Sequence, residues 1–185
     1  MGKLRCRWCN LKNPEYIKYH DNEWCKLNLS DNYLYEMLIL ESFQAGLSWE
    51  CVLNKREAFR SAYDGFQIDK VCSYGDEKIA ELQENKDIIR NKLKINSSVS
   101  NSKIFRDIVA ENGSFEAFLR LFWDGNIIFE IGKTTNDLSD IISCELKRRG
   151  MKFVGSTIIY SYLQAVGIIY SHDEQCFMYK GNLAL

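Results

Sequence analysis

The sequence has no excess of positive charge, because 24 lysines and arginines are balanced by 25 aspartates and glutamates and the formal net charge is -1. No global positive field therefore draws the protein onto nucleic acid, and any such binding has to rest on local basic patches. The sequence also shows no signal-peptide pattern and no apolar run long enough to cross a bilayer. We expect a soluble cytoplasmic protein with no membrane partner.

Proline, histidine and strand-like alternation are scarce as well. The one proline, Pro14, suits the first turn of a short helix that ends near His20. Residues 127–131 form the only short β-rich run, and repeats, low-complexity segments and obvious linkers are absent. With 185 residues, 46% of them hydrophobic, the chain can fill one core. We predict an all-α fold in which residues 1–185 form a single unit.

Apolar spacing, capping residues and glycine stop signals locate the helices. Ser30 and Asp31 cap a helix that Gly46 ends. Further helices are predicted over residues 48–63, 69–73, 76–84, 86–111, 115–123, 138–149 and 156–165.

One acidic residue interrupts the apolar face of the helix that follows Ser30. This face comprises Leu34, Met37, Leu38, Glu41 and Ala45, at helical spacing. Burying a carboxylate costs several kcal/mol unless a partner compensates it. Glu41 is therefore either held by an internal ion pair or by N–H groups of a neighbouring helix, or it is the floor of a pocket, because Leu47 and Trp49 follow at a tight corner near the same helix end. An acid beside a large aromatic side chain would suit a flat polar ligand.

A short turn between Gly150 and Gly155 lies among basic residues. A helix ends at Gly150, and Ser156 opens an apolar helix that runs through Ala165. Exposed N–H groups at that helix start would bind a phosphate. The neighbouring cations are Lys147, Arg148, Arg149 and Lys152. The alternative is an ordinary helical hairpin with a solvated basic turn. A second basic stretch within residues 90–106 has the composition of a solvated face.

Cysteine and histidine are spaced for one metal site. The seven cysteines have no regular spacing and fit a reducing compartment better than a disulfide framework. His172 and Cys176 lie four residues apart, so they face the same way on a helix or turn, and with two N-terminal ligands they could hold zinc. The spacing leaves the N-terminal pair open, because Cys6 could act with Cys9 or with His20. A site with four protein ligands would be structural and would not activate water.

Five segments, spread over nearly the whole chain, match one known pattern. They are C-x-W at residues 6–8, YIKYHDNEW at 16–24, LESFQAGLSW at 40–49, KRRGMKFVGSTIIYSYLQA at 147–165 and H-x-x-x-C at 172–176. Together they resemble the DNA-3-methyladenine glycosylase I family of the helix-hairpin-helix superfamily. The resemblance implies a helix-hairpin-helix glycosylase fold, with the hairpin near residues 138–170, and a base-excision repair enzyme. Such an enzyme extrudes 3-methyladenine from alkylated double-stranded DNA and releases it by hydrolysis.

The resemblance also assigns a cofactor and a base pocket. It implies one structural zinc per chain, joining residues 1–25 to residues 170–185. The matching ligands are Cys6, His20, His172 and Cys176, which leaves Cys9 as a bystander. The glutamate at the floor of the family's base pocket matches Glu41. The aromatic residues around that pocket match Tyr16, Tyr19, Trp49 and, at the mouth, Trp8.

Two further segments match the family's contacts with DNA. Gln44 and Leu47 match the corner that enters the gap left by the extruded nucleotide. The phosphate-gripping turn matches Gly150, Lys152, Gly155 and Ser156. The matched pocket segments contain no lysine, so we expect hydrolysis by a monomer without a Schiff base or strand cleavage.

Two positions depart from the family pattern. Cys25 stands where glycine is usual, behind the metal site, and Leu93 replaces a usual glycine, which weakens the case for DNA contacts by residues 90–94. Two other classes of function fit part of the pattern. One is a non-catalytic module that binds damaged DNA, and the other is a zinc hydrolase that uses His20, His172 and Glu41.

Overall fold

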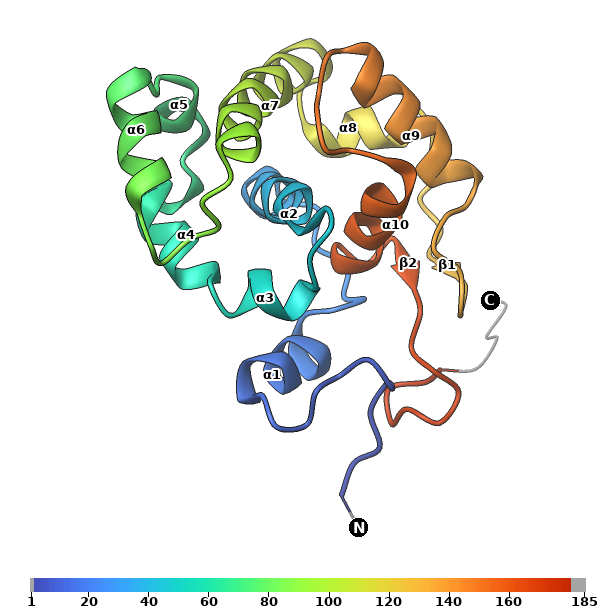
Figure 1. The fold of residues 1–185 in the computed structure, drawn as a ribbon. Coiled ribbons are helices and arrows are strands. Elements are labelled where there is room, and N and C mark those ends of the chain that lie inside the picture. Colours follow the sequence, from blue (N-terminus) through green and yellow to red (C-terminus); the bar gives the residue numbers. More distant parts are fainter. Residues whose placement is uncertain (1, 181–185) are drawn as a thin grey trace.

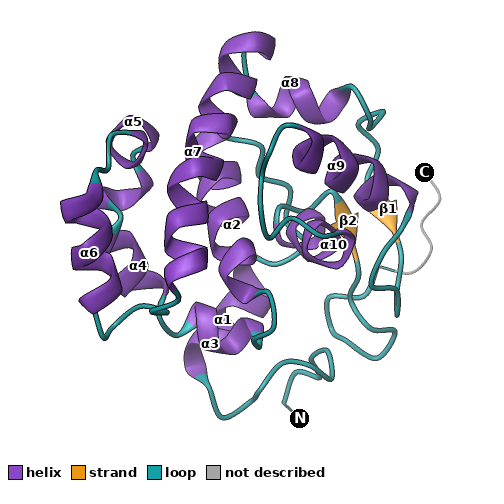
Figure 2. Ribbon diagram, turned by 45° about the horizontal axis from the view of Figure 1, so that its top comes forward, coloured by secondary structure: helices purple, strands orange, loops and turns teal. Residues whose placement is uncertain are grey.

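Helices make up most of the computed structural model, which describes residues 2–180 (Figure 1). Among these residues the helices are α1 (Pro14–Asn22), α2 (Asp31–Gln44), α3 (Trp49–Leu53), α4 (Arg56–Ala62), α5 (Ile68–Cys72), α6 (Asp76–Glu84), α7 (Lys92–Asn112), α8 (Phe115–Arg120), α9 (Asp137–Arg148) and α10 (Ser156–Ala165), with a 3-10 turn at Asp64–Phe66. Two short strands, β1 (Ile128–Phe129) and β2 (Ile169–Tyr170), pair in parallel (Figure 2). The predicted all-α class is confirmed, with this small sheet as an addition.

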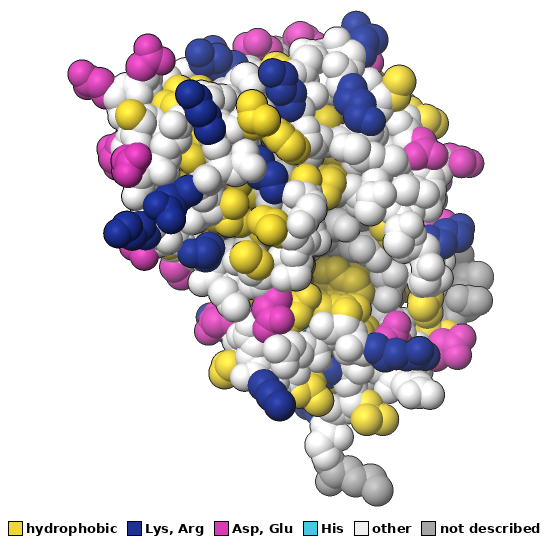
Figure 3. Space-filling view, viewed as in Figure 1, with side chains coloured by type: hydrophobic (Ala, Val, Ile, Leu, Met, Phe, Trp, Pro, Cys, Tyr) yellow, Lys and Arg dark blue, Asp and Glu magenta, His cyan; other side chains and the backbone are white. Residues whose placement is uncertain are grey.

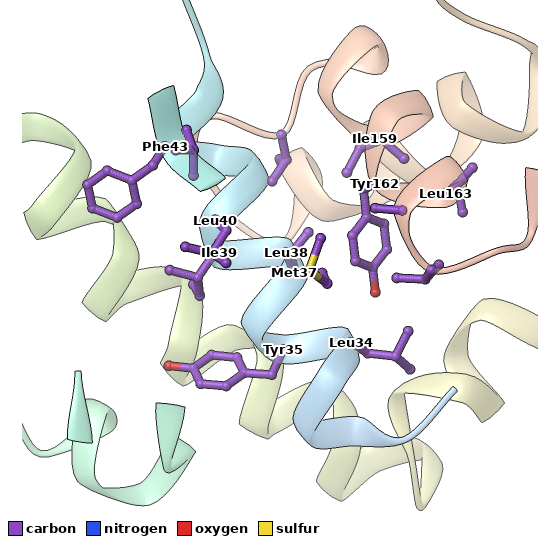
Figure 4. Packing of buried hydrophobic residues seen from close by; sticks show 14 of the residues in the cluster. Leu34, Tyr35, Met37, Leu38, Ile39, Leu40, Phe43, Ile159, Tyr162 and Leu163 are labelled. Carbon is purple, nitrogen blue, oxygen red and sulfur yellow. The ribbon is translucent and has the colours of Figure 1, made fainter. Parts of the chain in front are cut away.

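Helix α2 lies in the interior and is apolar around most of its circumference. Leu34 and Phe43, at opposite ends of the helix, are completely buried. Helix α10 packs along one side and supplies Ile159 and Leu163, while α7 runs along another side (Figure 4). A helix that is hydrophobic all round is stable only when its neighbours cover it. This packing carries Glu41 into the core.

Two groups of elements flank α2. Helices α4, α5 and α6 lie to its left in Figure 1, and α9, α10 and the sheet lie to its right. The first and last described segments meet near the base of the molecule, where Phe177 N–H donates to Leu4 O at 2.8 Å. Sequence-distant cysteines and histidines are thereby brought together. No helix within residues 2–180 is both long and apolar enough to cross a membrane.

Capping residues explain several helix boundaries. Pro14 occupies the first turn of α1, and the Asn13 side chain accepts the N–H groups of Glu15 and Tyr16. Gly113 ends α7 with a φ of 87°, a left-handed conformation that favours glycine. The helix predicted after Pro14 is confirmed but extends to Asn22, and the helix predicted over residues 156–165 is found with those bounds.

Two of the predicted helices have different bounds, and one strand was not predicted. The helix expected over residues 48–63 breaks into α3 and α4, because Lys55 has a non-helical backbone (φ -105°, ψ 3°), and the buried Arg56 that begins α4 donates to Glu36 and Glu23 at 2.6 Å. The helix expected over residues 86–111 begins only at Lys92, where Asn91 caps it. Strand β2 was not expected, since its two apolar residues follow α10 without any alternation that marks a strand.

Candidate active site and metal cluster

A cavity of about 310 Å³ opens between α1, α2, α3 and α10. The space-filling view shows a hollow with hydrophobic side chains at its base (Figure 3). The cavity is lined by Trp8, Tyr16, Tyr19, Trp24, Glu41, Gln44, Trp49, Gly132, Lys133, Ser161, Gln164, Ser171 and Asp173. Every residue that the sequence assigned to the base pocket therefore lies on the wall of this one cavity.

Glu41 is buried on this wall without a partner. Its side chain is 2% exposed, and its Oε2 atom has no hydrogen-bond donor within the described residues. Burial in these apolar surroundings raises the pKa of the Glu41 carboxyl well above its ordinary value. Buried polar atoms normally have partners, so an unpaired carboxylate oxygen beside a cavity marks a place for a ligand. The internal ion pair considered for Glu41 is not formed.

Aromatic rings surround the space beside Glu41. The centroids of Tyr19 and Trp49 lie 5.4 Å apart with their planes at 49°, and those of Trp8 and Tyr16 lie 5.1 Å apart. The Trp49 Nε1 atom is buried and unpaired in the part of the chain that the structure describes. The cavity thus combines π faces, a carboxyl group and a free N–H donor, a set that suits a flat polar ligand.

The opposite wall contains residues that the sequence interpretation missed. Ser161 and Gln164 line the cavity from α10, one turn apart on the same helix face. They are the two polar residues within YSYLQA, and that placement in an apolar helix was the signal available. Lys133 and Asp173 also line the cavity.

Cys6, His20, His172 and Cys176 form a buried cluster. Their ligand atoms lie within 4.8 Å of one another. The Nδ1 atom of His172 lies 3.4 Å from Cys6 Sγ and 3.5 Å from Cys176 Sγ, and His20 Nε2 lies 3.5 Å from Cys176 Sγ. A tetrahedral zinc site places sulfur and nitrogen ligands about 3.6 Å apart. The four residues therefore fit a metal ion, and Glu41 is not among them.

The groups around this cluster also suit a metal. The Asp21 carboxylate lies 2.8 Å from His20 Nδ1, which orients the other ring nitrogen toward the cluster. The Arg5 guanidinium lowers the pKa of Asp21 to about 2, so this carboxylate is ionised. Burial lowers the pKa of His172 to about 4, which keeps the ring neutral, as a metal ligand must be.

Cys9 and Cys25 lie beside the cluster without joining it. Cys9 Sγ is 3.8 Å from Tyr16 O, so the C-x-x-C alternative is not formed. Cys25 has a φ of 59°, the left-handed region that favours glycine, at the position where the resemblance shows glycine. Its buried thiol accepts the N–H of Ser171 at 3.3 Å.

Comparison with known proteins assigns nearly the whole chain to one family. The Methyladenine glycosylase family model matches residues 8–179. The chain belongs to the methyladenine glycosylase family. It is 38% identical to DNA-3-methyladenine glycosylase 1 of Escherichia coli over 96% of this chain and 98% of that protein.

Solved structures of methyladenine glycosylases share the fold. A crystal structure of 3-methyladenine DNA glycosylase I superposes with a TM-score of 0.90 at 37% identity, covering 95% of this chain and all of the other. A second one, in complex with 3-methyladenine, has a TM-score of 0.87 at 29% identity and covers 93% of this chain and 95% of the other.

In this methyladenine glycosylase, residues 44–47 form an exposed corner between α2 and α3, here called the wedge corner. Leu47 is 42% exposed although it is apolar, and Gly46 has a φ of 77°. The Gln44 Oε1 atom is buried without a donor among residues 2–180. The corner presents an apolar tip at the edge of the cavity.

Residues 150–155 form the hairpin turn between α9 and α10. Gly150 has a φ of 98° and requires glycine, whereas Gly155 has a φ of -63° with open space around its Cα. A side chain at residue 155 would therefore meet no other protein atom, whereas Gly150 is required by its backbone conformation. Lys152 is exposed beside the turn, and Ser156 opens α10.

The basic residues around the hairpin turn are not equivalent. Arg148 pairs with Glu145 at 2.7 Å, and Arg149 pairs with Glu111 and Glu145. Lys147 and Lys152 line a groove between the turn and the start of α7, together with Leu93, which is 70% exposed. Two of the four cations that the sequence grouped together are thus neutralised by acidic neighbours.

Proposed function

We propose that this chain is a monofunctional DNA N-glycosylase that extrudes 3-methyladenine from alkylated double-stranded DNA and releases it by hydrolysis, as a step of base-excision repair. Membership of the methyladenine glycosylase family supports this proposal. The observation that carries it is Glu41, a buried carboxylate without a counterion, beside a cavity walled by aromatic rings.

The charge of the lesion explains why these groups suffice for selection. Alkylation makes 3-methyladenine cationic, which weakens its glycosidic bond, so the leaving group needs no protonation. The rings of Tyr19 and Trp49 would stabilise the cation through their faces. A bound cation would also lower the raised pKa of Glu41, and the ionised carboxylate would accept the exocyclic amine. An uncharged adenine carries the same amine but would gain neither the cation–π stabilisation nor the lowering of the Glu41 pKa.

The geometry around Lys133 fits hydrolysis without strand cleavage. Lys133 lines the cavity, but its ammonium group pairs with Glu130 at 2.8 Å and is 57% exposed. An exposed, ion-paired ammonium is a poor nucleophile, so Schiff-base formation is not expected.

Two surface elements would hold the extruded strand. Leu47 and Gln44 of the wedge corner would enter the gap in the duplex, which offsets the few kcal/mol that base extrusion costs. The hairpin turn, with Gly150, Lys152, Gly155 and the α10 start at Ser156, would bind a phosphate through N–H groups and positive charge. In this proposal α9, the hairpin turn and α10 are the helix-hairpin-helix element.

The metal in this proposal is one structural zinc, held by Cys6, His20, His172 and Cys176. Four protein ligands close the coordination sphere, so zinc would supply stability and no activated water. Trp24 supports a link to the cavity, because its ring lies 4.7 Å from His172 on one side and 4.7 Å from Trp8 on the other. The zinc would then hold this wall of the base pocket in place.

We further propose that residues 1–185 form one glycosylase unit that acts as a monomer in the cytoplasm. The C-terminal segment that zinc would join to residues 1–25 is residues 170–185, and its last part, residues 181–185, lies outside the described residues. The continuous hydrophobic core and the seven free cysteines support a single unit in a reducing compartment. Light scattering of the purified protein tests the monomer.

Chromatography of the bases freed from alkylated DNA tests the proposed function. We expect free 3-methyladenine in the soluble fraction and intact DNA strands containing abasic sites. Binding to methylated DNA without any release of base would instead indicate a damage-binding module. Immediate loss of turnover on chelation, before any loss of folded structure, would indicate a zinc hydrolase.

A further inference from the structure

Helix α7 reaches both loops that the proposed function assigns to DNA, through two buried polar side chains. Lys94 Nζ donates to Phe43 O at 2.7 Å and to Ala45 O at 2.6 Å, where α2 gives way to the wedge corner. Asn101 makes two hydrogen bonds with the backbone of Lys152 in the hairpin turn: its Nδ2 donates to Lys152 O at 2.8 Å and its Oδ1 accepts Lys152 N–H at 2.9 Å.

Lys94 replaces the missing cap of α2. The last turn of α2 contains no basic residue, and no capping N–H bond forms at Ala45, so the final carbonyls need donors from elsewhere. The side chain of Lys94 is 6% exposed and has no carboxylate partner among the described residues. Desolvation lowers the pKa of this ammonium group. Burying a cation without a counterion costs free energy. A neutral donor could form the same hydrogen bonds to two carbonyl groups, so these bonds alone do not require the charge. The charge adds a positive field beneath the wedge corner.

Asn101 fixes the conformation of the hairpin turn. Asn101 is 1% exposed, and its side-chain amide pairs with both the N–H and the C=O of Lys152. The next residue, Phe153, has a φ of 58°, a conformation that side-chain-bearing residues rarely adopt without support. Ser143 on α9 also supports the turn, because its hydroxyl donates to Val154 O at 2.7 Å.

The two braces lie on one face of α7. Residues 94 and 101 are seven apart, which is about two helical turns and about 10.5 Å along the axis. Since one rigid helix carries both side chains, a change at either brace alters the spacing between the wedge corner and the hairpin turn.

We propose that Lys94 and Asn101 are positioning residues that hold the wedge corner and the hairpin turn at a fixed spacing, so that Leu47 enters the duplex while the turn binds the phosphate. This inference rests on the proposed function. Neither side chain lines the base cavity, so the pair acts on extrusion of the nucleotide and not on recognition of the free base.

Two measurements on the full-length protein separate these steps. Tryptophan fluorescence gives the affinity for free 3-methyladenine, and single-turnover assays give the excision rate from methylated duplex DNA. We expect Lys94→Met and Asn101→Leu to keep the affinity within about twofold and to slow excision on the order of tenfold. The double variant should be little slower than the slower single variant, because both braces serve one spacing.

Conservative variants and a control keep the test decisive. Lys94→Arg should recover part of the excision rate. If Asn101→Leu does not fold, Asn101→Asp takes its place in the test, because it keeps one of the two hydrogen bonds and should give a milder change. Arg56→Met removes a cation of similar burial that contacts neither loop, so it should lower the melting temperature and leave the excision rate of the folded protein near that of the wild type.

Unchanged excision in Lys94→Met and Asn101→Leu would overturn the inference. An equal loss of affinity and excision would also overturn it, because it would indicate general damage to the pocket. A wild-type protein that releases no base would reject the proposed function, and this inference with it.

Discussion

Glu36 and Glu41 lie five residues apart on α2, and only Glu36 is neutralised by cations. Its Oε1 atom accepts from Arg56 Nε at 2.6 Å and from Arg60 Nε at 2.9 Å. Glu41 forms no ion pair or hydrogen bond within residues 2–180 and lines the cavity instead. One helix therefore carries a structural carboxylate and a second one that is available to a ligand.

Glu41→Gln should abolish most base release without unfolding the protein. The amide keeps the shape of the side chain but loses the charge that attracts a cationic base, so we expect excision of 3-methyladenine to fall by about 100-fold or more. Chromatography of released bases and thermal melts measure the two effects. Glu36→Gln is the matched control and should lower the melting temperature while retaining excision. An active Glu41→Gln enzyme would remove Glu41 from this role.

The buried carboxyl also predicts a pH dependence of stability. Because burial raises the pKa of Glu41, the folded protein binds this proton more tightly than the unfolded chain does. The resulting stabilisation is complete below about pH 4.5 and is lost as the pH rises through the raised pKa. Glu41→Gln lacks this titration, so its melting temperature minus that of the wild type should increase with pH. A difference that stays constant from about pH 4.5 to pH 8 would contradict the buried, unpaired state.

Metal loss should follow the geometric cluster and not the C-x-x-C spacing. We expect one equivalent of zinc by elemental analysis. Cys176→Ala should lose the metal and lower the melting temperature by about 10 °C or more. Cys9→Ala should keep the metal, because its thiol lies outside the cluster. Equal metal loss in both variants, or a metal-free wild type, would count against the assignment.

Leu47→Ala should affect duplex DNA much more than the fold. The side chain is 42% exposed, so its truncation removes little buried surface, and we expect the melting temperature to change by less than about 2 °C. Loss of the apolar tip should slow single-turnover excision from duplex DNA by about tenfold. The affinity for free 3-methyladenine should stay unchanged, and a matching loss there would place Leu47 in the base pocket.

The salt dependence of DNA binding should distinguish Lys152 from Arg148. If Lys152 contacts a phosphate, Lys152→Ala should reduce the slope of log affinity against log salt by about one. Arg148 is paired with Glu145 at 2.7 Å, so Arg148→Ala should change the slope less. Fluorescence anisotropy over a series of salt concentrations measures both slopes, and equal slopes for the two variants would argue against the hairpin turn as the phosphate site.

Much of the fold could be read from local signals. Pro14 with Asn13, Gly113 and the Ser156 start of α10 mark boundaries that depend on backbone conformation and hydrogen bonds within a few residues. The break at Lys55 had no such signal. The contact made next to it, between Arg56 and Glu36 on another helix, joins residues 20 apart in the chain and has no local signal either.

The sequence by itself determined which residues could carry chemistry: an acid on an apolar helix face, aromatic residues in two segments, and cysteine and histidine near both ends of the chain. Only the tertiary structure decided between the alternatives. It paired Arg56 with Glu36 and left Glu41 unpaired, and it brought His20 into the metal cluster in place of Cys9. The reason is that ligand geometry, desolvation and ion pairing depend on distances between residues far apart in the chain, which helical periodicity cannot specify.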